Sequence, residues 1–239
     1  MSTTYYTIKG CFAGFGMQYL CILSGIVYCK YKNYVYIHTP FIFIDLCLDV
    51  AKANNFIGIK QNFELYDNNC ELIEKKGEIE VIKTPSIYFT NDVLEYIRGC
   101  YFKAEKPVIG PIDIAIHIRR GDVSKEENSE RYTDNSFYVE IIKKLKVKYP
   151  TYTITIFSEG KYEDFNDLGL EENCLKLNVD IFETFHSLVC SKVLIQSLST
   201  FSYCAGIINE NIVYYHDSFW CKKLDNWLKL SDLRSEINI

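Results

Sequence analysis

The sequence predicts an α/β fold built on parallel strands, and three observations support this. Short β-branched runs alternate with segments of helical periodicity through the second half of the chain, and the connections between them are short. The length of 239 residues suits one large domain or two small ones. Hydrophobic residues make up 48% of the chain and aromatic residues 15%, which is enough for a sizeable core.

The alternation begins with an apolar, β-branched run at 112–119, which predicts a buried strand. The polar stretch 121–133 predicts a loop. Asp134 or Asn135 can cap the helix that follows, and Pro150 ends it, because proline disfavours helical geometry in the residue before it.

The rest of this half repeats the pattern. Strands are expected at 153–157, 175–179, 192–196 and 212–215, and helices at 161–168, 182–190 and 201–209. This rhythm is typical of a doubly wound parallel sheet, whose ligands bind beyond the carboxyl ends of the strands.

The first half is less regular. A glycine-containing loop is expected at 10–16, a helix at 17–32 and a strand at 34–38. A break after Pro107 divides the chain into an N-terminal α/β domain, 1–107, and a C-terminal Rossmann-like domain, 108–239.

Composition excludes several classes of protein. The net charge of −5 argues against a nucleic-acid binder, which needs a basic surface. The ten cysteines are scattered singly, with no C-x-x-C pair for zinc, and are expected to be small buried side chains in a reducing compartment. No basic leader and no run of about 20 apolar residues occurs, so the expected location is cytoplasmic, with no transmembrane segment. The sequence indicates no oligomeric state.

Two adjacent arginines, Arg119 and Arg120, follow the predicted strand at 112–119. Arginine presents a planar fork that matches phosphate oxygens, and a buried guanidinium needs an anionic partner. Gly121 allows a sharp turn after the pair, so that Asp122 can fold back and orient one arginine, leaving the other for a diphosphate. A double salt bridge to nearby acids explains the pair equally well.

A second polar cluster, 197–202, stands where a strand passes into a helix. Hydroxyl side chains cap the free N–H groups of a helix start, and the same N–H groups bind phosphate. The density of hydroxyls favours phosphate over simple capping. No D-x-D motif supplies metal ligands for a diphosphate, so arginine and helix N-termini are expected to provide the positive charge without a metal or cofactor.

These motifs resemble those of a known enzyme superfamily. Residues 117–122, His-Ile-Arg-Arg-Gly-Asp, are similar to the H-x-R-R-G-D motif of α-1,2-fucosyltransferases and to the H-x-R-R-x-D motif of α-1,6-fucosyltransferases. Residues 155–159 resemble their second motif, 199–202 their third, and 14–18 their N-terminal G-x-G-N-Q loop. The four occur in the same order as in the superfamily.

The resemblance implies a GT-B-like fold of two Rossmann-like halves, with the donor nucleotide in the C-terminal half. It implies inverting transfer of fucose from GDP-fucose, the donor substrate, to a glycan acceptor. Arg119 would bind the β-phosphate, and His117 would contact the guanosine. The expected donor-binding residues are Gly14, Gly16, His117, Arg119, Arg120, Ser158, Asp180, Ser199, Thr200 and Ser202.

The expected catalytic residues are Arg119, Asp122 and Glu127. An inverting transfer also needs a base for the acceptor hydroxyl. Asp122, Glu126, Glu127 and His38 are candidates, although a solvated charge run is the ordinary explanation of the two glutamates. Two explanations fit Asp180 equally well: it contacts guanine, or it caps a helix.

The sequence departs from the superfamily at several positions. Met17 replaces the usual asparagine, Glu159 replaces the usual aspartate, and the N-terminal half is reduced. These departures leave three alternative hypotheses. The protein is a catalytically silent nucleotide-sugar or glycan-binding protein, a transferase for another nucleotide sugar, or a non-transferase protein with a site for another phosphorylated ligand.

Overall fold

The structure is a computed structural model that describes residues 3–8, 13–42, 49–60, 72–75 and 79–236. It divides into two compact units, the first formed by Met1–Lys106 with Cys221–Asp225 and the second by Pro107–Trp220 with Asn226–Ile239. Each unit contains a parallel sheet with helices, which confirms the α/β fold class with two Rossmann-like halves. The short segment that returns to the first unit lies inside the predicted C-terminal domain, and its Lys222 N–H donates to the carbonyl of Ile82.

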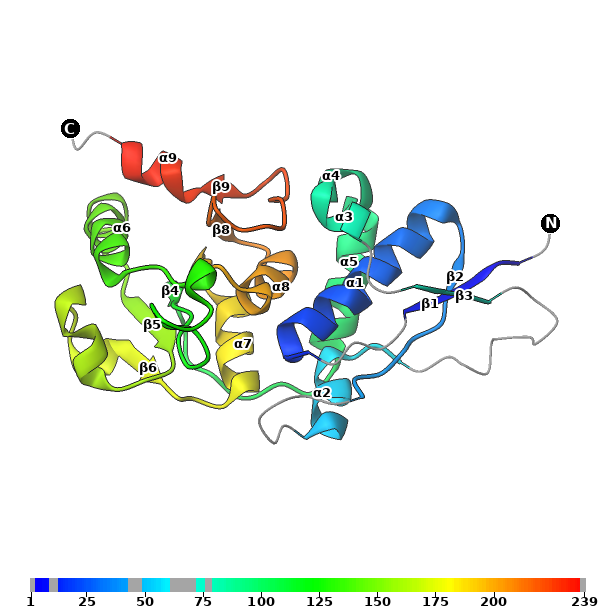
Figure 1. Cartoon of the computed structure of the whole chain (residues 1–239), viewed down its shortest axis with the longest axis horizontal. Coiled ribbons are helices and arrows are strands. Elements are labelled where there is room, and N and C mark those ends of the chain that lie inside the picture. The colour runs from blue at the N-terminus through cyan, green and yellow to red at the C-terminus, as the bar shows by residue number, and fades with distance from the viewer. Residues whose placement is uncertain (1–2, 9–12, 43–48, 61–71, 76–78, 237–239) are drawn as a thin grey trace. The chain divides into compact units, whose positions relative to one another are not determined.

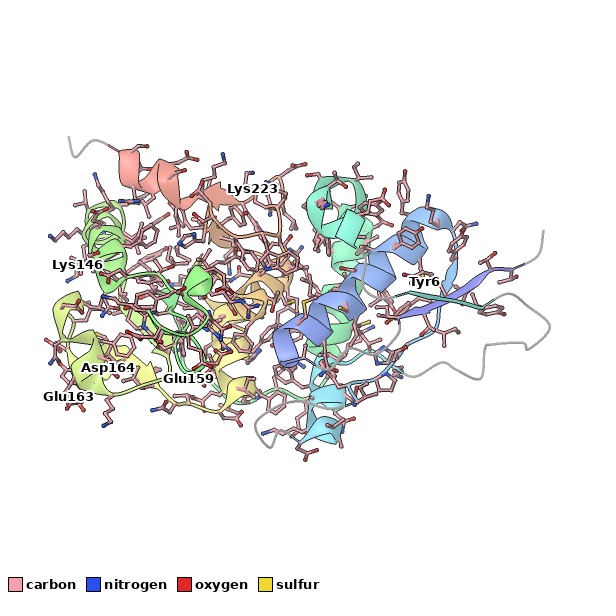
Figure 2. All side chains as sticks on the ribbon, viewed as in Figure 1. Tyr6, Lys146, Glu159, Glu163, Asp164 and Lys223 are labelled. Carbon is pink, nitrogen blue, oxygen red and sulfur yellow. The ribbon has the colours of Figure 1, made fainter. Side chains whose placement is uncertain are left out.

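The first unit contains a sheet in the order β2-β1-β3. Its strands are β1 (Tyr5–Ile8), β2 (Val35–Tyr36) and β3 (Leu72–Lys75), and its helices are α1 (Phe15–Lys32), α2 (Val50–Ile57), α3 (Ile79–Lys83), α4 (Pro85–Tyr88) and α5 (Asn91–Lys103). Both neighbours pair with β1 in parallel. Tyr6 in the central strand is fully buried (Figure 2). The strand β1 was not predicted from the sequence.

Helix α1 begins earlier than expected. Gly14 is its N-cap, so Gly16 lies in the first turn rather than in a loop, and it is buried. The helix ends where Asn33 adopts a left-handed conformation with φ of 57°. Residues 10–12 of the predicted glycine loop, and part of the charged segment before α3, lie outside the described residues.

The second unit is a six-stranded parallel sheet in the order β6-β5-β4-β7-β8-β9. Its strands are β4 (Ile114–His117), β5 (Ile154–Ser158), β6 (Leu175–Leu177), β7 (Val193–Ile195), β8 (Ile212–Tyr215) and β9 (Leu228–Lys229). Its α-helices are α6 (Asn135–Lys148), α7 (Ile181–Cys190), α8 (Thr200–Ile208) and α9 (Leu230–Ser235), and its 3-10 helices are η2 (Ser129–Arg131), η3 (Tyr162–Leu168) and η4 (Glu172–Cys174). Counted from the first strand of the unit, this is the order 3-2-1-4-5-6 of dinucleotide-binding sheets.

Alternating side chains divide this sheet between two helical layers. Ile114 and Ile116 of β4 belong to a core with α6, η3 and α9, whose members include Tyr138 and Leu145. Helices α7 and α8 pack against each other, and Figure 1 shows them on the other side of the strands from α6. The predicted cap of α6 is confirmed, because the Asp134 side chain accepts from the Ser136 N–H at 3.0 Å.

Candidate functional site

Several predicted site residues of the second unit lie at the point where the strand order of its sheet reverses. Strand β4 pairs with β5 on one side and with β7 on the other, so the chain builds outward in both directions from β4. In open parallel sheets this reversal leaves a crevice at the carboxyl ends of the strands. His117 ends β4 and Ser158 ends β5, while Ser197 follows β7, so all three stand at that edge.

His117 is buried at the carboxyl end of β4. Its Nδ1 lies 2.7 Å from Ser197 Oγ, a contact that joins the ends of β4 and β7. The ring also packs against Phe201 of α8, with the two ring centroids 5.4 Å apart. Burial, together with the positive charge of Arg119, lowers the pKa of His117 to about 3, so the imidazole is neutral at physiological pH.

Arg119 lies between two carboxylates. It forms an ion pair with Asp122, and its guanidinium lies 3.8 Å from a carboxylate oxygen of Glu159, which follows β5 (Figure 2). The Arg119 side chain is 29% exposed, whereas those of Asp122 and Glu159 are 49% and 47% exposed. The double ion pair that the sequence left open is therefore present. Because both acids are half-exposed, water can solvate them when an anion takes the guanidinium.

Arg120 is held quite differently. Its guanidinium donates to the carbonyl oxygens of Arg119 and Thr133 at 2.8 and 3.0 Å and to Asn135 Oδ1 at 2.6 Å. It also lies 4.4 Å from the ring centroid of Tyr132. These contacts join both ends of the loop after β4 to the start of α6. Both arginines line the cavity described below, but Arg120 is held by backbone and amide oxygens, whereas Arg119 is paired with half-exposed carboxylates.

The turn between the arginines and Asp122 requires glycine. Gly121 has a φ of 77°, a left-handed conformation that residues with a Cβ rarely adopt. A Cβ at this position would also lie 2.2 Å from Glu159 Oε2. The missing side chain therefore lets the Glu159 carboxylate approach the turn and stand beside Arg119.

The hydroxyl cluster divides into a cap and a buried contact. Ser199 is the N-cap of α8, and its Oγ accepts from the Phe201 N–H at 3.2 Å. Ser202 is fully buried, and its hydroxyl contacts Ser197 and the Ser199 carbonyl. Ser202 therefore contacts Ser197, which in turn contacts His117, and does not itself line the site.

A cavity of ≈ 110 Å³ lies at this edge of the sheet. Both polar and apolar side chains line it. Its lining residues are His117, Ile118, Arg119, Arg120, Ser158, Glu159, Val179, Ile181, Thr184 and Phe201. An anion-binding guanidinium next to an apolar wall suits a ligand with a phosphate and a flat ring.

Of the predicted donor-binding residues, four line the cavity: His117, Arg119, Arg120 and Ser158. Ser199, Thr200 and Ser202 stand at the start of α8 and are not among the lining residues, although their sequence neighbour Phe201 is. Asp180 caps α7, where its carboxylate accepts from the N–H groups of Phe182 and Glu183 at 3.0 and 3.2 Å.

The other predicted residues lie elsewhere. Glu127 is exposed in the loop after β4, and its backbone groups bond Ser124. Gly14, Gly16 and the candidate base His38 belong to the first unit. His38 lines a separate cavity of ≈ 310 Å³, and burial lowers its pKa to about 4.

Sequence reasoning missed part of the apolar wall. Val179, Ile181 and Thr184 line the cavity from the segment between β6 and the second turn of α7. Their position after the third strand of the unit could have identified them, since ligands bind beyond the carboxyl ends of such strands.

Two further properties concern the described part of the chain. Among these residues, no three His, Cys, Asp or Glu side chains form a group that could hold a metal ion. None of the helices in the described ranges combines the length and apolar character needed to cross a bilayer.

No protein-family model matches the chain, and no curated protein matches it. Several solved structures align with most of it. An arginine-to-lysine mutant of FUT1 from Arabidopsis thaliana, in complex with GDP, is 12% identical and aligns over 92% of this chain and 72% of its own, with a TM-score of 0.46. POFUT1 in complex with GDP-fucose is 12% identical over 94% and 97% of the two chains, with a TM-score of 0.46. The E. coli heptosyltransferase WaaC with ADP is 10% identical over 95% and 90%, with a TM-score of 0.41. Similarity at this level assigns neither a family nor an activity, so the function must be argued from the site.

Proposed function

We propose that this protein is a glycosyltransferase that transfers fucose from GDP-fucose to a hydroxyl group of a glycan. Four motifs in the order of the fucosyltransferase superfamily support the proposal, and three of them meet at one edge of the second sheet. The N-terminal glycine motif belongs to the first unit, and the proposed donor-binding role of Gly14 and Gly16 rests on the resemblance.

One observation carries the proposal. Arg119 lines a cavity at the reversal point of a dinucleotide-type sheet, and its ion-pair partners among the described residues are two half-exposed carboxylates. A diphosphate offers the guanidinium a bidentate partner of higher charge than either carboxylate. Asp122 and Glu159 would then turn toward solvent or toward the sugar.

In the proposed reaction, the bond between the sugar's anomeric carbon and the β-phosphate oxygen breaks, and its electrons remain on GDP. Arg119 stabilises the negative charge that develops on this leaving group, which is electrostatic catalysis without a metal. The acceptor oxygen attacks the anomeric carbon from the opposite face, which inverts its configuration, and its proton passes to a carboxylate. Asp122 and Glu127 are the proposed bases.

The nucleoside would occupy the apolar part of the cavity. Phe201 and Ile181 offer flat and aliphatic surfaces there, and His117 and Ser158 offer polar atoms. Ser199 and Thr200 would hold a phosphate at the N-terminus of α8. A cytoplasmic location belongs to the same proposal and is supported by the spacing of the ten cysteines, which are scattered singly with no C-x-x-C pair.

The test is release of GDP from GDP-fucose across a panel of glycan acceptors, preceded by a thermal-shift screen of nucleotide sugars. Stabilisation by GDP-fucose and acceptor-dependent release of GDP are expected. Stabilisation by a different nucleotide sugar would reassign the donor. Stabilisation only by an unrelated phosphorylated compound would contradict the transferase proposal.

A catalytically silent nucleotide-sugar-binding protein is the second candidate. It is favoured by the state of the proposed bases, because Asp122 is paired with Arg119 and Glu127 does not line the cavity. Binding of GDP-fucose without release of GDP, whatever the acceptor, would identify this function instead.

A further inference from the structure

A continuous chain of polar contacts leads from the imidazole of His117 to a backbone carbonyl. His117 Nδ1 lies 2.7 Å from Ser197 Oγ, which lies 3.4 Å from Ser202 Oγ. Ser202 Oγ in turn donates to the carbonyl oxygen of Ser199 at 3.2 Å. Ser197 and Ser202 are 2% and 0% exposed, so solvent does not compete for these hydroxyls.

The end of this chain fixes the direction of the hydrogen bond that the Ser202 hydroxyl donates. A carbonyl oxygen only accepts, so the single hydrogen of the Ser202 hydroxyl points to Ser199. Ser202 Oγ therefore accepts on its other side, from the Ser197 N–H at 3.2 Å and from the Ser197 hydroxyl. If the Ser197 hydroxyl donates to Ser202 and accepts from His117, the chain contains one hydrogen bond more than if Ser197 donates to His117, which favours the first arrangement.

The remaining nitrogen of His117 follows from the charge of the ring. Burial beside the Arg119 cation disfavours an imidazolium, so the ring carries one N–H group. If that group is Nδ1–H, Nε2 has a lone pair. The described residues supply no hydrogen-bond donor to Nε2, and His117 lines the cavity beside Arg119.

We infer that Ser197 and Ser202 are positioning residues that hold His117 as its Nδ1–H tautomer, so that Nε2 accepts a hydrogen bond from a hydroxyl or N–H group of the bound ligand. The cavity then has two different polar anchors. Arg119 takes an anionic group, and His117 takes a hydrogen-bond donor, which a fully ionised phosphate lacks. The identification of that ligand as a nucleoside diphosphate rests on the proposed function, whereas the tautomer does not.

The tautomer is tested by ¹⁵N NMR of protein labelled at its four histidines, because protonated and lone-pair nitrogens have different shifts and couplings. His117→Gln assigns the signal. We expect Nδ1–H in the wild type and a shift toward Nε2–H in Ser197→Ala and Ser202→Ala. Ser197→Thr keeps the hydroxyl and should restore Nδ1–H.

Ser191→Ala is the matched control, because Ser191 is equally buried and its hydroxyl donates to Leu188 O at 2.9 Å, outside this chain of contacts. It should leave the His117 signal unchanged. A wild-type signal of the Nε2–H form, or the same tautomer in the wild type and both alanine variants, would overturn the inference.

The ligand preference is tested by calorimetry with GDP and with inorganic pyrophosphate. Ser197→Ala should weaken GDP about tenfold, the loss expected for one hydrogen bond, and leave pyrophosphate unchanged. Equal weakening of both ligands would contradict the role of His117 as an acceptor. If the wild type binds no GDP, the proposed function fails, while the tautomer measurement still decides this inference.

Discussion

The two ends of the second sheet use ionic groups in opposite ways. At the amino end, Asp113 accepts from Lys192 Nζ at 2.8 Å and from both the N–H and the hydroxyl of Thr153 at 3.0 Å. These residues precede β4, β7 and β5, so one carboxylate joins three neighbouring strands. At the carboxyl end, Arg119 lines a cavity, and within the described ranges its ion-pair partners are two half-exposed carboxylates.

The difference separates ionic groups that hold the fold from those that are available to a ligand. Asp113 has its carboxylate oxygens satisfied by protein donors and lines no part of the ligand cavity. Arg119 has partners that water can replace. The comparison predicts that changes at the carboxyl end remove function with little effect on stability, and that changes at the amino end do the reverse.

The largest effect is expected for Arg119→Ala. Transfer should fall by at least about 100-fold, because the group that stabilises the leaving diphosphate is lost. The free energy of unfolding should change by less than about 1 kcal/mol, since partly exposed ion pairs contribute little. Steady-state GDP release and urea denaturation measure the two quantities.

Arg131→Ala is the control for that variant. Arg131 lies in the same polypeptide loop, is exposed and pairs with Glu130 at 3.5 Å, but does not line the cavity. It should keep full transfer activity. Full activity in Arg119→Ala, or an equal loss in both variants, would remove the distinction between the two ends.

Gly121→Ala should have the next largest effect. The left-handed backbone and the 2.2 Å approach to Glu159 Oε2 both oppose a methyl group, so we expect a loss of about 1–3 kcal/mol in unfolding free energy and weaker GDP binding. Gly14→Ala provides the contrast for stability alone, because its φ is −62° and no atom of the described residues lies within 4 Å of the added carbon. A neutral Gly121→Ala variant would show that this turn does not constrain the site.

Asp113→Asn tests the amino end. We expect a loss of about 1 kcal/mol in unfolding free energy with unchanged GDP affinity. The hydrogen bonds from Lys192 and Thr153 lower the pKa of Asp113 from 3.8 to about 2, so its stabilisation is complete above the ordinary pKa and is lost as pH falls toward the lower value. Acid titration of stability should show this loss in the wild type and a smaller one in Asp113→Asn. A variant with wild-type stability and acid response would contradict the role of Asp113 in holding the strands.

The smallest effect concerns Asp180, whose two explanations can be separated. Asp180→Ala removes the cap of α7 and should lower stability by about 1 kcal/mol, whereas Asp180→Ser keeps a capping oxygen and should lower it less. If Asp180 only caps the helix, Asp180→Ser binds GDP like the wild type. Strongly weakened GDP binding in a stable Asp180→Ser variant would show that the carboxylate contacts the ligand.

The elements of the second unit were predicted well because the hydrophobic periodicity and the capping and proline residues at the element ends agree there. Strand β5 and helix α6 fall within one or two residues of their predicted positions, and Asp134 caps the helix as expected. Strand β9 and helix α9 were missed. A two-residue strand carries no periodicity, and both residues of β9 are exposed, so only its pairing with β8 defines it.

The sequence identified residues of the site but not the different role of each residue. The sequence identified Arg119 and Arg120 as a pair, and nothing local distinguishes them. Only the fold shows that the Arg120 guanidinium donates hydrogen bonds to Thr133 and Asn135, which lie at the other end of the loop. The buried position of Ser202 likewise depends on how α8 packs, which spacing along the chain does not determine.

Calorimetric titration of GDP into three proteins tests the central claim most directly: the wild type, Arg119→Ala and Asp113→Asn. We expect one binding site in the wild type, a loss of affinity of at least about 100-fold in Arg119→Ala, and wild-type affinity in Asp113→Asn. Absence of GDP binding in the wild type, or equal affinity in Arg119→Ala, would contradict the claim that the carboxyl end of this sheet is a nucleotide site.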